Sequence, residues 1–442
     1  MSRFRLIVSP TKSTHEGDGS GGISVTKQMH KILDQRGYLS CEMGGQTLRD
    51  LYNDRSSSFN PPRLRQSRHG ELNTLTISSV TEMSNQEVES GDAPDLEGTE
   101  TPYKFGYLTI VVSGAQRLQI PNPQHIKVLK YLISRGAPVD LPDIAGYTAL
   151  SHGTMSHLAK LDLCRVLLES GSDPYQRNRY GEVPLLDCFQ TNGIGAIDLL
   201  MEFGADIDIA DADGVKPREF QLKAGPEVTA AVQRWLRKRS GDEKSMDTKA
   251  CEFCKKPGGD GVQLRLCLKC QTARYCSTVC QRSHWPTHRP ICQPFSVRNT
   301  VTLIPYYSDA RNGFVQPLAK FSRDLLSIPT PDTPESHHRF AHTPKNLSAN
   351  SPKSIIIKVQ VPFDALSNLR NVRLGGDLLV YTKKRDFVCT IRRVDRPEEY
   401  DRISQVVRTK GVGGAKAYFA AELRGKTALI VKVSEVLAEQ PF

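Results

Sequence analysis

Apolar residues recur at helical spacing between residues 104 and 240, and three of the apolar runs each lead into a glycine. The runs VLKYLIS, VLLES and LLMEF come before Gly136, Gly171 and Gly204, which lie 35 and 33 residues apart. Ten residues after each of these comes another glycine, at Gly146, Gly181 and Gly214. Glycine is common at the position that ends a helix. The pattern predicts a repeating unit of about 33 residues with two helices and a turn.

This period resembles the ankyrin repeat, as do Gly204-Ala205-Asp206 and the stretch Tyr147-Thr148-Ala149-Leu150, which stands where the family has Thr-Pro-Leu-His. Ser151 replaces the family histidine, and the second and third units keep little beyond glycine and proline. The resemblance implies three to four divergent ankyrin repeats over residues 104–240, with an earlier unit starting at Gly106. Such an α-helical solenoid has an extended concave surface that binds proteins. A helical solenoid of another family is the alternative.

The segment RWLRKRSGDEK, at residues 234–244, is expected to be a solvated last helix that ends this array. A nuclear localisation patch is the other interpretation.

Residues 354–442 contain five strand-like segments, SIIIKVQV, DLLVYTKK, DFVCTIRR, KAYFAAEL and TALIVKVSEV. A helical pattern, EEYDRISQVVRTK, lies between the third and the fourth. From residue 353 on, 17 basic and 10 acidic residues give a net charge of +7. Contact of these strands with phosphate groups is one interpretation, and solubilising charge on their solvent faces is the more common one. We expect a small basic α+β domain, preceded by a proline-rich linker at residues 293–353.

Residues 1–54 contain one helical pattern, VTKQMHKILDQRG, and are an N-terminal segment or a divergent repeat. Residues 55–103 are rich in Ser, Asn, Glu and Gly, which predicts a disordered linker. The first residues have too short an apolar run for a signal peptide, and no run approaches the roughly 20 apolar residues that span a bilayer. We therefore expect an intracellular protein, in the cytoplasm or the nucleus, that does not insert into a membrane.

Seven of the eleven cysteines lie between residues 251 and 292. With one histidine they form four pairs, Cys251-x2-Cys254, Cys267-x2-Cys270, Cys276-x3-Cys280 and His288-x3-Cys292. In a reducing compartment such a cluster indicates metal ligation rather than disulfides. Eight ligands complete two closed tetrahedral sites, which are structural rather than catalytic.

His284 is out of phase with the pair spacing and is not expected to bind metal. The remaining cysteines, Cys41, Cys164, Cys188 and Cys389, are expected to be small buried residues.

The four pairs, with the Tyr275-Cys276 and Cys280-Gln281 steps and Trp285, closely resemble the MYND zinc finger. The family interleaves its ligands. The resemblance thus implies one zinc ion on Cys251, Cys254, Cys276 and Cys280, and a second on Cys267, Cys270, His288 and Cys292. The spacing by itself does not choose between this and a sequential arrangement.

The family binds short proline-containing peptides as an added strand beside its hairpin, here residues 263–274. Gln281 and Trp285 hold the matching peptide-binding positions; packing in the small core of the finger is the alternative for Trp285. Seven basic and two acidic residues between 251 and 292 give +5, and seven thiolates with two zinc ions add −3. The loaded finger is therefore too weakly basic for a phosphate-binding module.

No catalytic set of residues is evident in the sequence. The SET-domain motifs of some MYND methyltransferases are missing, and the P-loop-like Gly425-Lys426-Thr427 has Ala420 where its first glycine belongs. We expect a multidomain, non-catalytic adaptor whose ankyrin solenoid and MYND finger bind proteins. A nuclear chromatin- or DNA-associated regulator that uses the basic C-terminal domain is the alternative.

Overall fold

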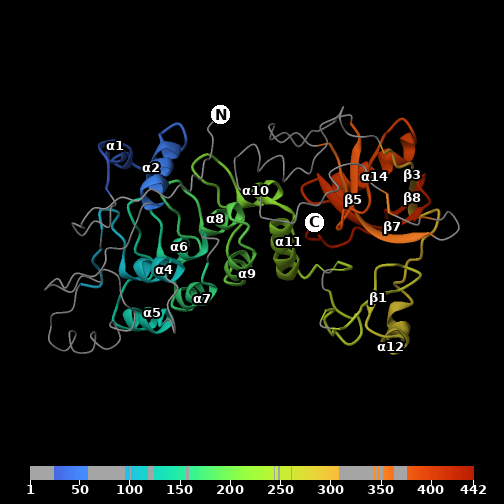
Figure 1. Ribbon diagram of the computed structural model, residues 1–442, viewed down its shortest axis with the longest axis horizontal. Helices are drawn as coiled ribbons and strands as arrows, with labels where there is room; N and C mark the ends of the chain where they lie inside the picture. The colour runs from blue at the N-terminus through green and yellow to red at the C-terminus, as the bar shows by residue number, and fades with distance from the viewer. Residues whose placement is uncertain are drawn as a thin grey trace. The chain divides into compact units, whose positions relative to one another are not determined.

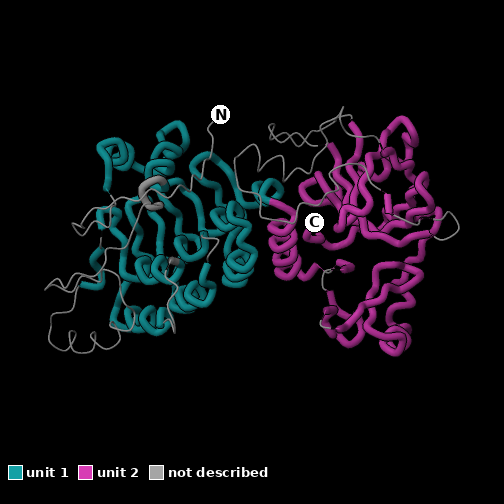
Figure 2. The backbone as a smooth tube through the Cα atoms, viewed as in Figure 1, with its two compact units in different colours: residues 1–224, 323–329 teal, residues 225–322, 330–442 magenta. Residues whose placement is uncertain are grey.

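The computed structural model describes residues 24–57, 95–99, 101–117, 124–155, 159–242, 244–246, 249–259, 261–307, 343–344, 347, 352–362 and 376–442. Most residues of the two predicted linkers, at 55–103 and 293–353, lie outside these ranges. The chain forms two compact units (Figure 2): unit 1 comprises residues 1–224 and 323–329, and unit 2 comprises residues 225–322 and 330–442. Within the described ranges, no helix is long and apolar enough to cross a bilayer.

Helices stack in two rows in unit 1 (Figure 1). One row consists of α4 (Tyr107–Arg117), α6 (Ala149–Met155), α8 (Pro184–Gln190) and α10 (Pro217–Ala224). The other consists of α5 (His125–Ser134), α7 (Leu161–Glu169) and α9 (Ile194–Glu202). The apolar runs of the sequence face inward, since Leu129, Leu167 and Leu200 are fully buried. The stacked pairs confirm the predicted unit of two helices and a turn.

The turns that connect successive helix pairs repeat one set of hydrogen bonds. Oδ1 of Asp143 accepts from the backbone N–H groups of Ala145 and Tyr147, at 2.8 and 3.0 Å. Asn178 and Asp211 hold the equivalent positions and accept from the N–H groups two and four residues later. The glycine three residues after each of them has a φ of 83°, 75° and 80° in turn. Glycine adopts this left-handed conformation without a steric cost, which explains the second periodic glycine of the sequence.

Neighbouring turns are joined by backbone hydrogen bonds. The N–H of Arg179 donates to the carbonyl of Ala145 at 2.8 Å, and Ala212 donates to Tyr180 at 2.9 Å. In the same way Ile144 donates to Tyr103 at 3.0 Å. Tyr103 therefore belongs to a further turn that precedes α4, in keeping with the earlier unit expected at Gly106.

Two helices from the N-terminal segment, α1 (Lys27–Leu33) and α2 (Gly45–Ser57), lie across these turns, whereas the sequence predicted one helix there. The guanidinium of Arg179 donates to the carbonyl oxygens of Leu33, Gln35 and Gly37. The last carbonyls of a helix lack partners within it, so this arginine satisfies the end of α1 from a turn of the array.

Side chains of α2 also contact the turns of the repeat array. The Tyr52 hydroxyl donates to Oδ2 of Asp143 at 2.5 Å, and its ring stacks on Tyr103 with the centroids 4.7 Å apart. Arg49 forms an ion pair with Glu182 at 2.8 Å. A buried cluster that includes Met29, Leu48 and Tyr147 surrounds these polar contacts. The N-terminal segment is thus part of the core of unit 1.

Of the four cysteines outside the finger, three are buried as predicted and one is not. Cys164, Cys188 and Cys389 are buried, as expected for small apolar residues. Cys41 is exposed, which contradicts the expectation. Its N–H and its thiol both contact the carboxylate of Asp213, at 2.9 and 3.0 Å, so a polar partner holds it at the surface.

An antiparallel sheet with the strand order β3-β8-β7-β4-β5-β6 forms the centre of unit 2. The strands are β3 (Thr300–Leu303), β4 (Lys353–Gln360), β5 (Leu378–Thr382), β6 (Val388–Ile391), β7 (Lys416–Arg424) and β8 (Ala428–Lys432). The five predicted strands are confirmed, as is the helix between the third and the fourth, α14 (Pro397–Lys410). β3 lies within the range predicted as a linker; the alternating burial of its four residues fits an edge strand.

The two faces of the sheet differ in chemistry. One face packs Ile357, Phe419 and Val431 against α14 in an apolar core. The other carries Lys358, Lys416 and Lys432, which are only 2%, 2% and 1% exposed. The expectation that strand charges face solvent is wrong for these three. Each is satisfied internally: Lys358 by the Phe442 carbonyl at 2.6 Å, Lys416 by the Thr229 hydroxyl at 3.0 Å, and Lys432 by Glu435 at 2.5 Å.

Helix α11 (Pro226–Ser240) belongs to unit 2, although the sequence placed it at the solvated end of the repeat array. Its Arg237 is buried and pairs with buried Glu439 of the C-terminal segment. Thr229, on the same helix, accepts from Lys416 of β7. These partners, distant in the sequence, explain why a run of charges that resembles a surface helix is partly internal.

Candidate metal centre

Residues 251–292 fold into a small hairpin followed by a helix. β1 (Arg265–Leu266) pairs with β2 (Arg274–Tyr275), and α12 (Thr278–His288) follows directly. The Ser277 side chain accepts from the N–H of Cys280 at 3.1 Å and begins the helix as an N-cap. Cys280 and His288 lie eight residues apart on one face of α12, so the helix carries a potential ligand at each end.

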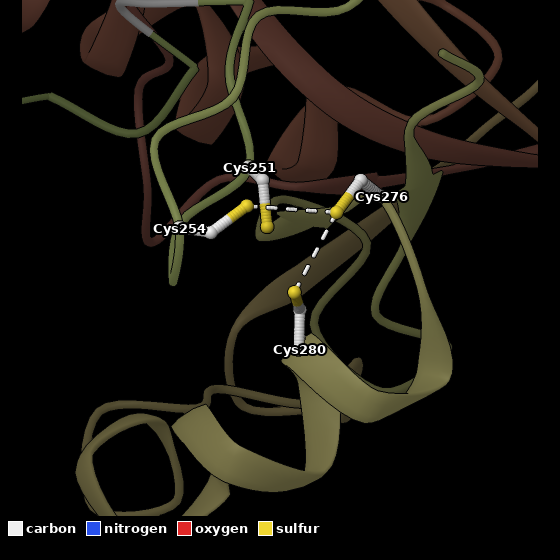
Figure 3. A group of neighbouring side chains, drawn as sticks. All are labelled: Cys251, Cys254, Cys276 and Cys280. Atoms are coloured by element: carbon white, nitrogen blue, oxygen red, sulfur yellow. Dashed lines mark hydrogen bonds between the residues drawn. The ribbon is translucent and has the colours of Figure 1, made fainter.

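The first cluster brings together four sulfur atoms (Figure 3). Cys251 and Cys254 precede the hairpin, Cys276 follows β2, and Cys280 lies in the first turn of α12. The sulfur of Cys276 is 3.6 Å from that of Cys254 and 3.5 Å from that of Cys280. All four sulfurs lie within 4.8 Å of one another.

The second cluster consists of Cys267, Cys270, His288 and Cys292. The first two come from the connection between β1 and β2, and the last two from the end of α12 and the residues that follow it. The sulfur of Cys270 is 3.6 Å from Nε2 of His288, and the four ligand atoms lie within 4.8 Å of one another. Cys267, Cys270 and His288 are buried.

Both clusters fit a zinc ion. Sulfurs about 2.3 Å from a zinc ion at the corners of a tetrahedron are roughly 3.8 Å apart. The closest sulfur–sulfur distances, 3.5 and 3.6 Å, are within a few tenths of an ångström of this spacing. Residues 251–292 also match the family model of the MYND finger. This segment is a MYND finger.

The ligands of the MYND finger interleave. The first and third pairs along the chain form one cluster, and the second and fourth form the other. The spacing of the pairs did not choose between an interleaved and a sequential arrangement, and the resemblance to the MYND family implied the interleaved one. Because the hairpin and α12 each contribute to both clusters, two zinc ions hold these elements together in a finger that has little apolar core.

The thiols have an environment that suits a cation. Burial raises the pKa of the Cys251 thiol, but the N–H groups of Cys254, Cys276 and Phe253 outweigh it and bring this pKa down to about 6. Hydrogen bonds with the side chains of Cys280 and Cys254 raise the pKa of Cys276 to about 12, because they favour its protonated form; a positive charge at the site is needed to make it a thiolate. Zinc supplies that charge and binds cysteine as the thiolate.

Each cluster provides four ligands, so a zinc ion there has no coordination position left for water, as in structural sites. His284 belongs to neither cluster, as its spacing predicted. Its Nδ1 lies 3.0 Å from the hydroxyl of Tyr275, whose ring is buried beside His288. His284 therefore supports the packing of the finger without touching the metal.

The expected peptide-binding residues lie on one side of α12. Gln281 and Trp285 are four residues apart and half-buried. The ring centroid of Trp285 is 5.9 Å from that of His288, and Nζ of Lys269 is 5.2 Å from the Trp285 ring. Trp285 is not part of the buried cluster of the finger. The structure therefore leaves part of this ring available to a ligand.

Only one edge of the hairpin is open in the described part of the finger. β2 pairs with β1 on one side, and on the other its Arg274 carbonyl accepts from the N–H of Glu252 at 2.9 Å. β1 has β2 as its one strand partner among the described residues. Leu268, just after β1, is 91% exposed.

Sequence reasoning missed that the finger contacts the sheet of unit 2. Lys432 of β8 donates to the carbonyl of Cys270 at 3.2 Å, and Gln271 donates to Glu422 of β7 at 2.6 Å. These partners are separated by 162 and 151 residues. No local pattern marks such pairs, and lysine in a strand is ordinarily interpreted as a surface residue.

Proposed function

We propose that this chain is a non-catalytic adaptor in which the MYND finger binds a proline-containing peptide of one partner and the repeat array binds a second protein. The observation that carries the proposal is the pair of closed, four-ligand clusters. They fix α12 and the hairpin with the ring of Trp285 and the β1 edge still accessible. Closed zinc sites organise a binding surface and leave no metal position for chemistry.

The peptide would add as a strand beside β1. Backbone hydrogen bonds along the open edge would provide affinity, and Gln281 and Trp285 would select side chains. A proline ring suits the flat face of an indole, and proline lowers the entropy that a peptide loses on binding. Exposed Leu268, at the end of the same edge, offers an apolar contact for a flanking residue.

A peptide library with a fixed central proline tests this mode. Peptides selected on the full chain are expected to bind Trp285→Ala at least about 30-fold more weakly, since an aromatic hot spot contributes 2 kcal/mol or more. Trp235→Ala, which changes the other tryptophan of the chain, on α11, is the matched control and should keep full affinity. The zinc content of both variants should equal that of the wild type. Equal binding by Trp285→Ala would refute the mode.

For unit 1, we propose that the stacked helix pairs are divergent ankyrin repeats. The period of the glycines and the recurring turn bonds at Asp143, Asn178 and Asp211 support the assignment. Because α1 and α2 lie across these turns, the second partner would bind a surface that they leave exposed, such as the one around Tyr175.

Photo-crosslinking at two exposed residues would test the two-partner claim. A crosslinking amino acid at Tyr175 and one at Leu268 are expected to capture different proteins from the same cell, present together in one complex. Capture of the same protein at both positions would contradict the adaptor.

The C-terminal sheet gives little support to the alternative function, a DNA-associated regulator. Three of its strand lysines are buried, and Arg392, Arg393 and Arg396 pair with acidic side chains. Phosphate binding needs accessible, unpaired cations and weakens steeply with salt. We propose that binding to the peptide responds much less to salt. We also place the protein inside the cell, because the clusters need reduced cysteines.

A further inference from the structure

The C-terminal sheet contacts the finger at the residues of the second cluster. Lys432 is 1% exposed, and its Nζ donates to the carbonyl of the ligand Cys270 at 3.2 Å. Its charge is balanced by Glu435 at 2.5 Å, which in turn accepts from the Ser245 hydroxyl. A buried ammonium that is both paired and hydrogen-bonded fixes its neighbours, because a buried charge without partners is strongly unfavourable.

A second contact lies one residue further along the chain. The amide of Gln271 donates to Glu422 of β7 at 2.6 Å. Gln271 is buried and has a φ of 58°, a conformation that few residues other than glycine adopt readily. The sheet thus holds the tight turn that places Cys267 and Cys270 beside His288.

The path of the chain and the apolar packing strengthen the same contact. Leu266 of β1 packs into a cluster with Tyr418 of β7 and Leu437. Gln293, next to the ligand Cys292, accepts from the hydroxyl of Ser434 at 3.2 Å. After Cys292 the chain reaches β3, an edge strand of the sheet, within eight residues.

The first cluster has no such support in the described residues. Among the described residues, no hydrogen bond joins a ligand of this cluster to the sheet; Cys254 is exposed, and Cys251 is buried within the finger. The two zinc sites of the finger therefore differ in their surroundings: the first has one buried ligand, whereas the second has three and is attached to a sheet.

We propose that the C-terminal sheet is the platform that holds the second zinc site, with Lys432 and Gln271 as positioning residues, so that the two zinc ions are unequal. The zinc of the first cluster exchanges readily, and the zinc of the second is retained. This assigns a role to residues 353–442 that is independent of any bound peptide. Residues that orient metal ligands from behind typically change metal affinity about 10- to 100-fold when they are replaced.

The test is the time course of zinc release from the full chain to a coloured chelator, with native mass spectrometry to count the ions. The wild type should release one zinc quickly and one slowly. Cys276→Ser, which disrupts the first cluster, should retain one zinc and show the slow phase alone. Lys432→Met added to Cys276→Ser should accelerate this phase about 10- to 100-fold. Lys410→Met on α14, which packs on the opposite face of the sheet, is the matched control and should leave it unchanged.

Lys432→Met leaves Glu435 without its cation and could unfold the sheet. Gln271→Gly is the second variant, because glycine fits the positive φ and removes the contact with Glu422 without strain. It should accelerate the slow phase while the circular dichroism of the sheet is unchanged. An unchanged slow phase in both variants, or equal release of the two ions by the wild type, would overturn the proposal. Neither result depends on whether the finger binds a peptide.

Discussion

The ion pair between Arg49 of α2 and Glu182 is one of the buried contacts that attach the N-terminal helices to the repeat array. The two side chains are 15% and 4% exposed, and the guanidinium also lies 4.3 Å from the centroid of the Tyr180 ring. Arg49→Met keeps most of the side-chain volume and removes the charge. The variant leaves a buried Glu182 with the amide of Asn178 as its nearest donor, at 3.0 Å.

Breaking a buried ion pair from one side costs about 3–5 kcal/mol, because the remaining charge has lost its partner in a site that water does not reach. Such a loss should lower the hydrogen-exchange protection of α2 and of the turn at Glu182 by roughly 100- to 5,000-fold. Hydrogen exchange followed by mass spectrometry suits this measurement, since it resolves peptides of unit 1 in the full chain. Replacing both partners, Arg49→Met with Glu182→Leu, should recover most of the protection, because no unpaired charge then remains.

A second Arg–Glu pair in the same unit is the matched control. Arg165 and Glu202 lie 2.7 Å apart, but their side chains are 43% and 45% exposed. Arg165→Met should change protection little, since water replaces the lost partner. Equal, small effects of the Arg49 and Arg165 variants would refute the interpretation that α2 is held by a buried pair.

Two further predictions concern pH. Burial, and then the charge of Glu182, raise the pKa of buried Asp187 well above its usual value. The folded state therefore holds a proton that the unfolded state releases, and unit 1 loses stability as pH rises from about 4 through the folded pKa of Asp187. Asp187→Asn should stabilise unit 1 at pH 8 in thermal unfolding, and this gain should vanish toward pH 4. Burial lowers the pKa of Lys416 to about 7, so its contribution to the stability of unit 2 should grow as pH rises from 7 toward 10, by at most about 1.4 kcal/mol per pH unit. Lys416→Met should remove this slope, and parallel pH profiles of variant and wild type in urea unfolding followed by tryptophan fluorescence would contradict the assignment.

Local signals in the sequence predicted the parts of the fold that depend on local chemistry. The six periodic glycines mark backbone positions with positive φ, and Gly136 and Gly146 show φ values of 96° and 83°. The cysteine pairs marked the two clusters because metal geometry fixes their spacing. Runs rich in apolar and β-branched residues marked five strands of the sheet. The four-residue edge strand β3 was missed, because it lies in a stretch predicted as a linker.

The remaining features depend on partners far away in the sequence. In the sequence, Lys432 looks like an ordinary solvent-facing lysine of a strand. Its burial is explained by its contact with Cys270, which lies 162 residues earlier. Arg49 pairs with Glu182, 133 residues later, so no local sequence pattern predicts that α2 packs against the repeat array. Cys41 resembled the other single cysteines and differs because Asp213 holds it at the surface. Such pairings follow from the three-dimensional arrangement and not from periodicity.

The central claim is that two interleaved zinc sites build the finger. The measurement that tests it most directly is the zinc content of the purified full chain by native mass spectrometry, beside Cys276→Ser. Two zinc ions in the wild type and one in the variant are the expected result, because Cys276 belongs to one cluster only. One zinc or none in the wild type, or two in the variant, would contradict the account.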